Sequence, residues 1–295
     1  MLRRVLLPLD AADDDTRAVA FTRSLIRRAA LDVLLLRVEE WPMAGPGSAY
    51  GWNPPVRAGR LTSVSRSLGG DGPAGVRVLS RQAISSGAVL ERARLGEASL
   101  IVLPYRHEGL WARLLRGPGC QWILWDSPIP VLAVPEGDGL PAPKISRILF
   151  VHRAGGGAVD GSRIAIEVAQ LFDASVGLVP FTPPASPLPE VLLRWLFGEP
   201  LSAPQGNEAL EALFRKRGVD ARMIPAAGAS AEAVSSWARE NEVDLVIRCR
   251  PAGPDRAGDA LTRHLLDVLQ IPVLVLRDRA AGRRSPGALP LRLRL

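Results

Sequence analysis

RVLLPLD at residues 4–10 returns as RILFVHR at residues 147–153, 143 positions later. Each segment is almost unbroken in its apolar character, which is typical of a strand buried on both faces of a parallel sheet. Two more pairs repeat in the same order, at offsets of 145 and 142: EASLIVLP at 97–104 with EVDLVIRC at 242–249, and IPVLAVPE at 129–136 with IPVLVLRD at 271–278. A period of this length is a whole domain. The sequence therefore predicts two copies of one domain.

Each copy alternates predicted strands with predicted helices. Strands are expected at 4–9, 31–38, 76–80, 99–103 and 130–134 in the first copy, and at 148–152, 175–180, 219–224, 244–248 and 272–276 in the second. Helices are expected at 18–29, 88–95, 119–125, 162–172, 231–240 and 261–269. Buried parallel strands alternating with helices predict an α/β fold, here two tandem three-layer α/β domains, each around a five-stranded, mostly parallel sheet. Ligands in such sheets bind at the carboxyl ends of the strands.

The predicted division of the chain is a first domain at 1–136, a linker at 137–145, a second domain at 146–279 and a basic tail at 280–295. Gly and Pro make the linker a semi-rigid connector. After its second strand, each copy also has a long segment that is predicted to be irregular. These segments span 41–71 and 181–205, and the second holds a short amphipathic stretch at 190–197. Connections this long are typical of lids or disordered loops.

The net charge of +7 comes from 37 basic and 30 acidic side chains. Residues 1–143 hold 17 basic and 14 acidic side chains, a net +3, and residues 144–279 hold 16 of each. The tail from 280 to 295 adds four Arg and no acid, a net +4. A nucleic-acid-binding domain should show its excess charge on a folded face. A nucleic-acid partner is therefore not expected.

Cysteine and histidine are scarce, with two Cys and three His in 295 residues. That is too few for a disulfide framework or a metal centre built on soft ligands. The sequence has no run of 18 apolar residues, so no membrane span is expected. Its start, MLRRVLLPLD, lacks the long apolar region and small-residue cleavage site of a signal peptide. We expect a cytoplasmic protein without a metal.

The two copies, with the closing segments PVLAV at 130–134 and PVLVL at 272–276, resemble a tandem universal stress protein. The resemblance covers residues 3–278. It implies a Rossmann-like fold of the adenine nucleotide alpha hydrolase type. The fifth strands of that family pair across a dimer. In a tandem chain, 130–134 would pair with 272–276 and form an intramolecular pseudo-dimer.

The resemblance also implies where a nucleotide would bind. In the ATP-binding branch of the family, an Asp ends the first strand and touches the base and ribose. A loop of the form G-x-x-G, nine residues, then G-[S/T] follows the fourth strand and holds the phosphates. Glycines let backbone N–H groups approach phosphate oxygens, and the next helix N-terminus favours anions.

The first copy keeps the Asp, at Asp10, and the loop spacing, but three of the four loop signatures are lost. Pro104, His107 and Pro118 replace two glycines and the hydroxyl residue, and Pro118 also removes an N–H. A shifted register, with Gly109 and Gly119, also keeps the spacing but puts Arg106 at the first Gly and Cys120 at the hydroxyl residue. Asp10 is either a ligand contact or part of a helix cap with residues 13–16. Arg106, His107 and Arg113 are either an anion site or solvated loop charges. If the first copy holds a nucleotide, the residues expected to bind it are Asp10, Val38, Pro104, Arg106, His107, Gly109 and Gly117.

The second copy departs further, because Arg153 replaces the Asp and reverses the charge. Its loop starts at Cys249, is three residues shorter, and has Asp259 at the position of the third Gly, where an acid would repel phosphate. The stretch RAGGGAVDGS at 153–162 lies between a predicted strand and helix but lacks GxGxxG. It is either a flexible loop or an anion site, and the candidates for that site are Arg153, Gly155, Gly156 and Gly157.

Catalytic residues are not indicated. Cys249 lies between two arginines, where it is either a reactive thiol or a buried inert one. His264 and Asp267 are one helical turn apart, but no Ser or Cys nucleophile is placed for a triad. We therefore expect a protein that is not an enzyme.

The leading interpretation is a stress-related binding or regulatory protein, non-catalytic, without a cofactor and with no ATP in the second copy. Its partner would be a small molecule or a protein that the sequence does not name. The first alternative is an ATP or adenine-nucleotide module acting through the first copy, with ATP as its ligand. The second is a nucleotide-using enzyme on the same fold. Assembly beyond the pseudo-dimer into a homodimer is left open, as is the role of the tail.

Overall fold

The computed structural model describes residues 2–9, 16–38, 58–69, 75–83, 86–105, 122–137, 144–153, 159–181, 203–224, 231–250 and 256–277. In the first half the elements are β1 (Arg4–Leu9), α1 (Arg17–Arg28), β2 (Asp32–Val38), α2 (Ala58–Gly69), β3 (Val76–Ala83), α3 (Ser86–Leu95), β4 (Leu100–Tyr105), α5 (Trp122–Asp126) and β5 (Val131–Pro135). In the second they are β6 (Arg147–Arg153), α6 (Val159–Phe172), β7 (Ser175–Phe181), α8 (Ala203–Lys216), β8 (Ala221–Met223), α9 (Ala231–Glu240), β9 (Leu245–Arg250), α10 (Arg256–Asp267) and β10 (Val273–Arg277).

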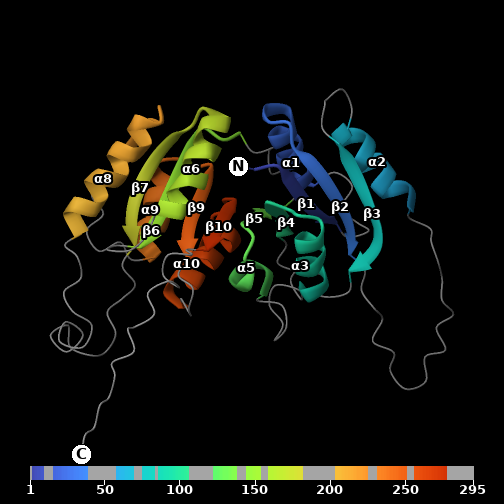
Figure 1. Cartoon of the computed structure of the whole chain (residues 1–295). Coiled ribbons are helices and arrows are strands. Elements are labelled where there is room, and N and C mark those ends of the chain that lie inside the picture. The colour runs from blue at the N-terminus through green and yellow to red at the C-terminus, as the bar shows by residue number, and fades with distance from the viewer. Residues whose placement is uncertain are drawn as a thin grey trace, which may run out of the picture.

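The strands form one ten-stranded sheet in the order β3-β2-β1-β4-β5-β10-β9-β6-β7-β8. Within each half the strands are parallel. The halves join where β5 pairs antiparallel with β10, with Leu132 opposite Leu274 at the centre. Figure 1 shows this seam in the middle of the molecule. The two segments expected to pair, 130–134 and 272–276, therefore do so.

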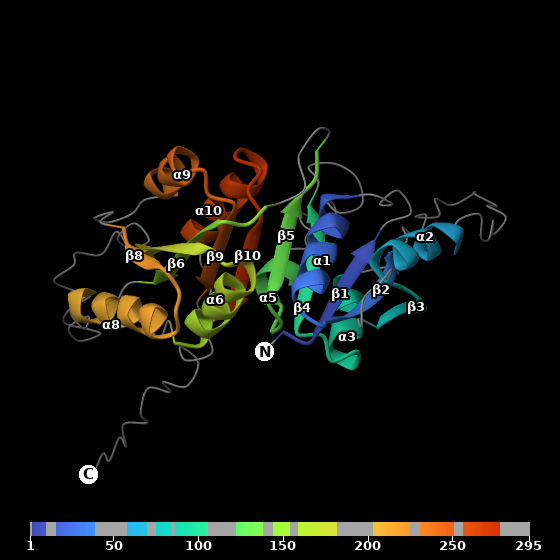
Figure 2. The ribbon, with the colours of Figure 1, turned by 90° about the horizontal axis from the view of Figure 1, so that it is seen from above.

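Helices cover both faces of the sheet (Figure 2). Strand residues alternate between the faces, so Val5 and Leu7 pack on one side and Leu6 on the other. One apolar cluster includes residues of α1, α2, α6 and α8, and the other includes residues of α3, α5, α9 and α10. Each cluster takes residues from both halves, so the apolar core is continuous across the seam. The expected three-layer α/β fold is confirmed.

The expectation that 41–71 and 181–205 are irregular is wrong in part, because two helices lie in or overlap them. α2 falls inside 41–71, and α8 begins inside 181–205 and runs beyond it. Their apolar residues are few but recur at helical spacing: Val64 and Leu68 in α2, and Leu210 and Phe214 in α8, are all buried. The Gly, Pro and Ser content before each helix concealed that spacing. The amphipathic stretch at 190–197 and the tail at 280–295 lie outside the described residues.

The fourth strands also run further than expected. β4 reaches Tyr105 and β9 reaches Arg250, two residues beyond the predicted ends, because both keep their ladder partners there. β8 is shorter, since only Ala221–Met223 pair with β7. The predicted linker packs at its end, where Ile145 is buried in the core. Within the described ranges, no helix is long and apolar enough to cross a membrane.

Candidate functional site

Two of the residues expected to bind a nucleotide in the first half fall in the described chain. Val38 ends β2 and Pro104 lies near the end of β4, and both are buried. The Val38 side chain packs in the apolar core, and Pro104 lies opposite Val134 in the ladder. Both stand at the expected carboxyl edge of the sheet. The remaining five, Asp10, Arg106, His107, Gly109 and Gly117, lie outside the described residues.

The start of α1 lies at the same edge and is capped by the protein itself. Thr16 is the N-cap, and its hydroxyl accepts a hydrogen bond from the backbone N–H of Val19 at 3.2 Å. Glu136, just after β5, accepts from the backbone N–H groups of Arg17 at 2.7 Å and Ala18 at 2.8 Å. A carboxylate is favourable at a helix N-terminus. Glu136 therefore occupies the place at the start of α1 where an external anion could otherwise bind.

Arg17 links this edge to the second half. Its Nη1 donates to the carbonyl of Gln270 at 3.0 Å and to that of Pro135 at 3.4 Å. Burial lowers the pKa of Arg17 below its ordinary value, and the nearby Glu136 carboxylate opposes this shift. A guanidinium stays protonated in proteins. Arg17 is therefore a positively charged link between the two halves.

In the second half, the end of β9 carries two buried arginines. Arg248 is 1% exposed and Arg250 is 7% exposed. Residues two apart in a strand point to the same face, and here that face is covered by α10. A buried guanidinium is costly unless it is paired. Their partners decide what this end of the sheet can bind.

Asp259 and Thr262 of α10 meet these arginines. Nη1 of Arg248 donates to the hydroxyl of Thr262 at 2.8 Å and lies 3.5 Å from Oδ1 of Asp259. The same carboxylate oxygen lies 3.7 Å from Nε of Arg250. Thr262 in turn donates to the carbonyl of Gly258 at 2.9 Å. One carboxylate oxygen is thus shared by two buried guanidinium groups.

Asp259 stands where the resemblance places the third glycine of a phosphate loop. Its carboxylate side chain is 19% exposed and lies beside cations that are almost completely buried. An anion in that position complements the two guanidinium charges in a medium of low dielectric constant. Chemically, the end of β9 holds an internal ion pair at the place where a nucleotide-binding copy would hold phosphate.

Cys249 points to the opposite face of β9 from the two arginines. It is a buried cysteine that forms no disulfide, and it packs in the core beside α6. A Cβ added at Gly161 would overlap its Sγ and come within 3.7 Å of Leu276 Cδ1. Glycine at 161 is therefore what allows α6 to approach β9. This burial fits the inert alternative for Cys249.

The Gly161→Ala substitution should destabilise the protein by about 1–2 kcal/mol, because overpacking outweighs the better helix propensity of Ala. The measurement is urea unfolding of the full chain. In the Cys249→Ala background the overlap is absent, so the same substitution should be neutral or stabilising. An equal loss in both backgrounds would contradict this contact.

The predicted anion site of the second half falls mostly outside the described chain. Arg153 ends β6, where it pairs with Phe181, and Gly155, Gly156 and Gly157 lie outside the described residues. In the part that the structure describes, no group of three or more His, Cys, Asp or Glu could hold a metal ion.

Equivalent residues at the ends of β4 and β9 each contact the opposite half. The hydroxyl of Tyr105 donates to Asp267 at the end of α10. The guanidinium of Arg250 lies over the ring of Trp125 in α5, 5.8 Å from its centroid. His264, which the sequence pairs with Asp267, is exposed. The end of each fourth strand is therefore tied to a helix of the other half.

Sequence reasoning missed the sharing of Asp259 by Arg248 and Arg250. The available signal was IRCR at 247–250, in which two arginines occupy one face of a strand that is otherwise buried. A buried cation needs an anionic or polar partner. Asp259, already noted at the third-Gly position of the phosphate loop, was one of the acids close to them along the chain.

A family model described as "Universal stress protein family" matches residues 1–135. The second half is not covered by that match. No curated protein matches the sequence.

Solved structures share the fold over nearly the whole chain. A universal stress protein from Archaeoglobus fulgidus DSM 4304 aligns with a TM-score of 0.66 at 12% identity, covering 93% of this chain and 96% of its own. A Pseudomonas aeruginosa UCBPP-PA14 protein, provisionally named a universal stress protein, aligns with a TM-score of 0.60 at 15% identity, covering 95% of each. The cytoplasmic domain of a prokaryotic cation chloride cotransporter aligns with a TM-score of 0.53 at 14% identity, covering 95% and 98%. At these identities the likeness shows the fold alone, and one fold hosts different functions.

Proposed function

We propose that this chain is a non-catalytic, stress-related binding or regulatory protein of the tandem universal stress type, whose second half holds no ATP. The observation that carries the proposal is the carboxylate of Asp259 between Arg248 and Arg250. A bound triphosphate would bring its negative charge against that carboxylate, and like charges in a low-dielectric site are unfavourable. Phosphate could enter only by displacing an ion pair that the fold already supplies.

The proposed arrangement is a pseudo-dimer within one chain. The antiparallel pairing of β5 with β10 supports it, as do the contacts across the seam. These contacts hold the two halves at one relative position. A protein of this kind would act by binding a partner or ligand on a fixed scaffold, in the cytoplasm, without turning a substrate over.

A second candidate function is adenine-nucleotide binding in the first half. It is favoured by the family match, which falls on residues 1–135 only. Glu136 argues against an anion at the start of α1, where its oxygens already bond the Arg17 and Ala18 amides. Asp10 at the end of the first strand is the residue on which this candidate depends.

Native mass spectrometry of the freshly purified full chain tests the proposal, because it reports bound ligand and assembly together. We expect the Asp10→Ala variant, which removes the first-half candidate, to carry no adenine nucleotide. An adenine nucleotide retained at one per chain in that variant would contradict the account of the second half. A nucleotide present in the wild type and absent from Asp10→Ala would support the second candidate.

A further inference from the structure

The amino edge of the second half, at the opposite end of its strands from Asp259, contains an open cavity of about 310 Å³. Its apolar lining on the α9 face of the sheet includes Ile224 and Val243, which are 8% and 6% exposed. Trp237 of α9 forms part of its wall, and Arg147 and Arg222 line it with polar groups. The volume lies at the lower end of the range for small-molecule sites.

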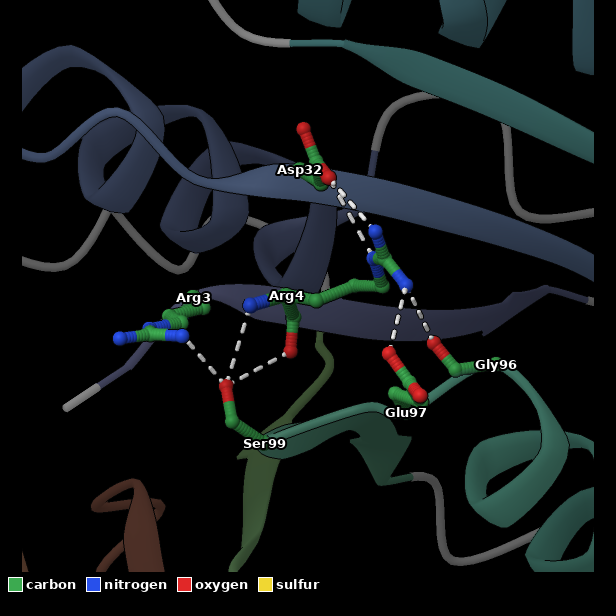
Figure 3. Close-up of polar contacts among 6 residues, drawn as sticks. All are labelled: Arg3, Arg4, Asp32, Gly96, Glu97 and Ser99. Carbon is green, nitrogen blue, oxygen red and sulfur yellow. Dashed lines mark hydrogen bonds and ion pairs between the residues drawn. The ribbon is translucent and has the colours of Figure 1, made fainter.

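The first half shows how the equivalent edge is closed in the other copy. Arg4 donates from Nη2 and Nε to Asp32, at 2.9 and 3.3 Å, and from Nη1 to the carbonyl of Gly96 at 2.9 Å (Figure 3). Glu97 lies 3.9 Å from the same guanidinium. Leu34 packs so close to Gly96 that a Cβ there would overlap it. An ion pair and a leucine side chain thus occupy this edge.

In the second half both of those side chains are replaced by smaller ones. The strand register makes Ser175, opposite Arg147, the equivalent of Asp32, which is opposite Arg4. It also makes Gly177, opposite Leu149, the equivalent of Leu34, which is opposite Leu6. A serine does not hold the guanidinium as a carboxylate does. The Asp32 carboxylate and the Leu34 side chain therefore have no counterpart at positions 175 and 177, on the edge where the cavity lies.

Gly177 also lets an aromatic ring approach the sheet. A Cβ at this position would lie 2.6 Å from Ile224 Cδ1 and 3.1 Å from Trp237 Cη2. The end of the indole therefore lies directly over the strand. Arg92 of α3 holds the position equivalent to Trp237, 145 residues earlier. Of these two equivalent positions, only the one in the second half carries an aromatic side chain.

Two arginines give the cavity N–H donors for an anion, and two acidic side chains beside them offset their charge. Nη1 of Arg147 donates to the Asn241 carbonyl at 2.9 Å and to the Glu242 carboxylate at 3.1 Å. Arg222 is 82% exposed, and its Nε lies 3.8 Å from Asp220. Each guanidinium has five N–H donors in a fork that suits a carboxylate. Because Asp220 and Glu242 already offset two positive charges, a polyphosphate would be disfavoured.

We propose that this amino-edge cavity binds a small planar aromatic carboxylate, with its ring against Trp237 and its carboxylate at Arg222 and Arg147. The ring would pack against Ile224, Val243 and the indole, which lie on one face of the sheet. The carboxylate would accept charge-assisted hydrogen bonds from solvated side chains that can turn toward it. This site is independent of the proposed absence of ATP, because it lies at the other end of the strands.

The test is isothermal titration of the full chain with indole-3-carboxylate, paired with saturation-transfer NMR. We expect saturable binding, weakened about tenfold in Arg222→Gln, because a hydrogen bond to a charged group is lost. Trp237→Arg, which installs the residue of the first half, should abolish it. Indole-3-carboxamide should bind about tenfold more weakly than the carboxylate, because it lacks the charge.

Arg77→Gln is the matched control, since Arg77 holds in the first half the register position of Arg222. It should leave the affinity unchanged. Arg222 is largely exposed, so its replacement should not disturb folding even if Trp237→Arg does. No saturable binding to the wild type, or equal affinity in wild type and Arg222→Gln, would overturn the proposal. Asp259→Gly should leave the binding of indole-3-carboxylate intact. A failure of the cavity proposal can therefore be told apart from a failure of the proposal that the second half holds no ATP.

Discussion

Asp259→Asn should lower the free energy of unfolding by about 3 kcal/mol, which is the loss typical of breaking a buried ion pair from one side. The substitution removes the negative charge that lies beside the guanidinium groups of Arg248 and Arg250, which are 1% and 7% exposed. The amide is nearly the same size, so the loss reports charge and not volume. Urea unfolding of the full chain measures it.

The same variant should regain stability when an anion is added. Inorganic phosphate or sulfate should raise its unfolding midpoint more than that of the wild type, because a ligand that binds only the folded state stabilises it. Asp220→Asn is the control: that carboxyl is 67% exposed, and exposed pairs contribute about 0–1 kcal/mol. If Asp259→Asn cost no more than Asp220→Asn, the shared carboxylate would not be stabilising the end of β9.

The second large effect is expected at the seam. Phe172 of α6 is 5% exposed and packs edge-on against Phe21 of α1, with ring centroids 5.9 Å apart. Arg28 lies over the same ring at 5.1 Å from its centroid. Phe172→Ala should therefore cost about 3–5 kcal/mol and loosen the contact between the halves.

Phe214→Ala is the matched control for that substitution. Phe214 is fully buried but packs on Phe150 within the second half. Both variants should be destabilised, but only Phe172→Ala should speed hydrogen exchange of β5 and β10 by local opening of the seam. Equal seam protection in the two variants would mean that α1 and α6 do not hold the halves together.

The fold was readable from the sequence because its signal is local and occurs twice. Apolar runs such as RVLLPLD and RILFVHR predict buried parallel strands wherever they occur, and the resemblance to universal stress proteins implied the pairing of the last strands. α2 and α8 were missed for a physical reason. Each buries only a narrow apolar stripe, on Val64 and Leu68 or on Leu210 and Phe214, next to sequence rich in loop-forming residues.

The sites were less predictable because they depend on which side chains face each other. Thr16 was among the expected caps of α1, but Glu136, which accepts from the Arg17 N–H at the same helix start, lies 119 residues from Arg17. Asp259 was recognised as an obstacle to phosphate, whereas its contacts with Arg248 and Arg250 needed the packing of α10 on β9. The amino edges of the two halves differ at equivalent positions, Leu34 and Gly177. That difference is visible in the sequence only once the register is known.

Equilibrium dialysis of the full chain against radiolabelled ATP tests the central claim most directly, with wild type, Asp10→Ala and Arg250→Gln measured side by side. The claim is that the second half carries its own anion, Asp259, where a phosphate would bind. It predicts that Asp10→Ala binds no ATP at ligand concentrations that saturate ordinary nucleotide sites. Stoichiometric ATP binding that survives Asp10→Ala and is lost in Arg250→Gln would contradict it.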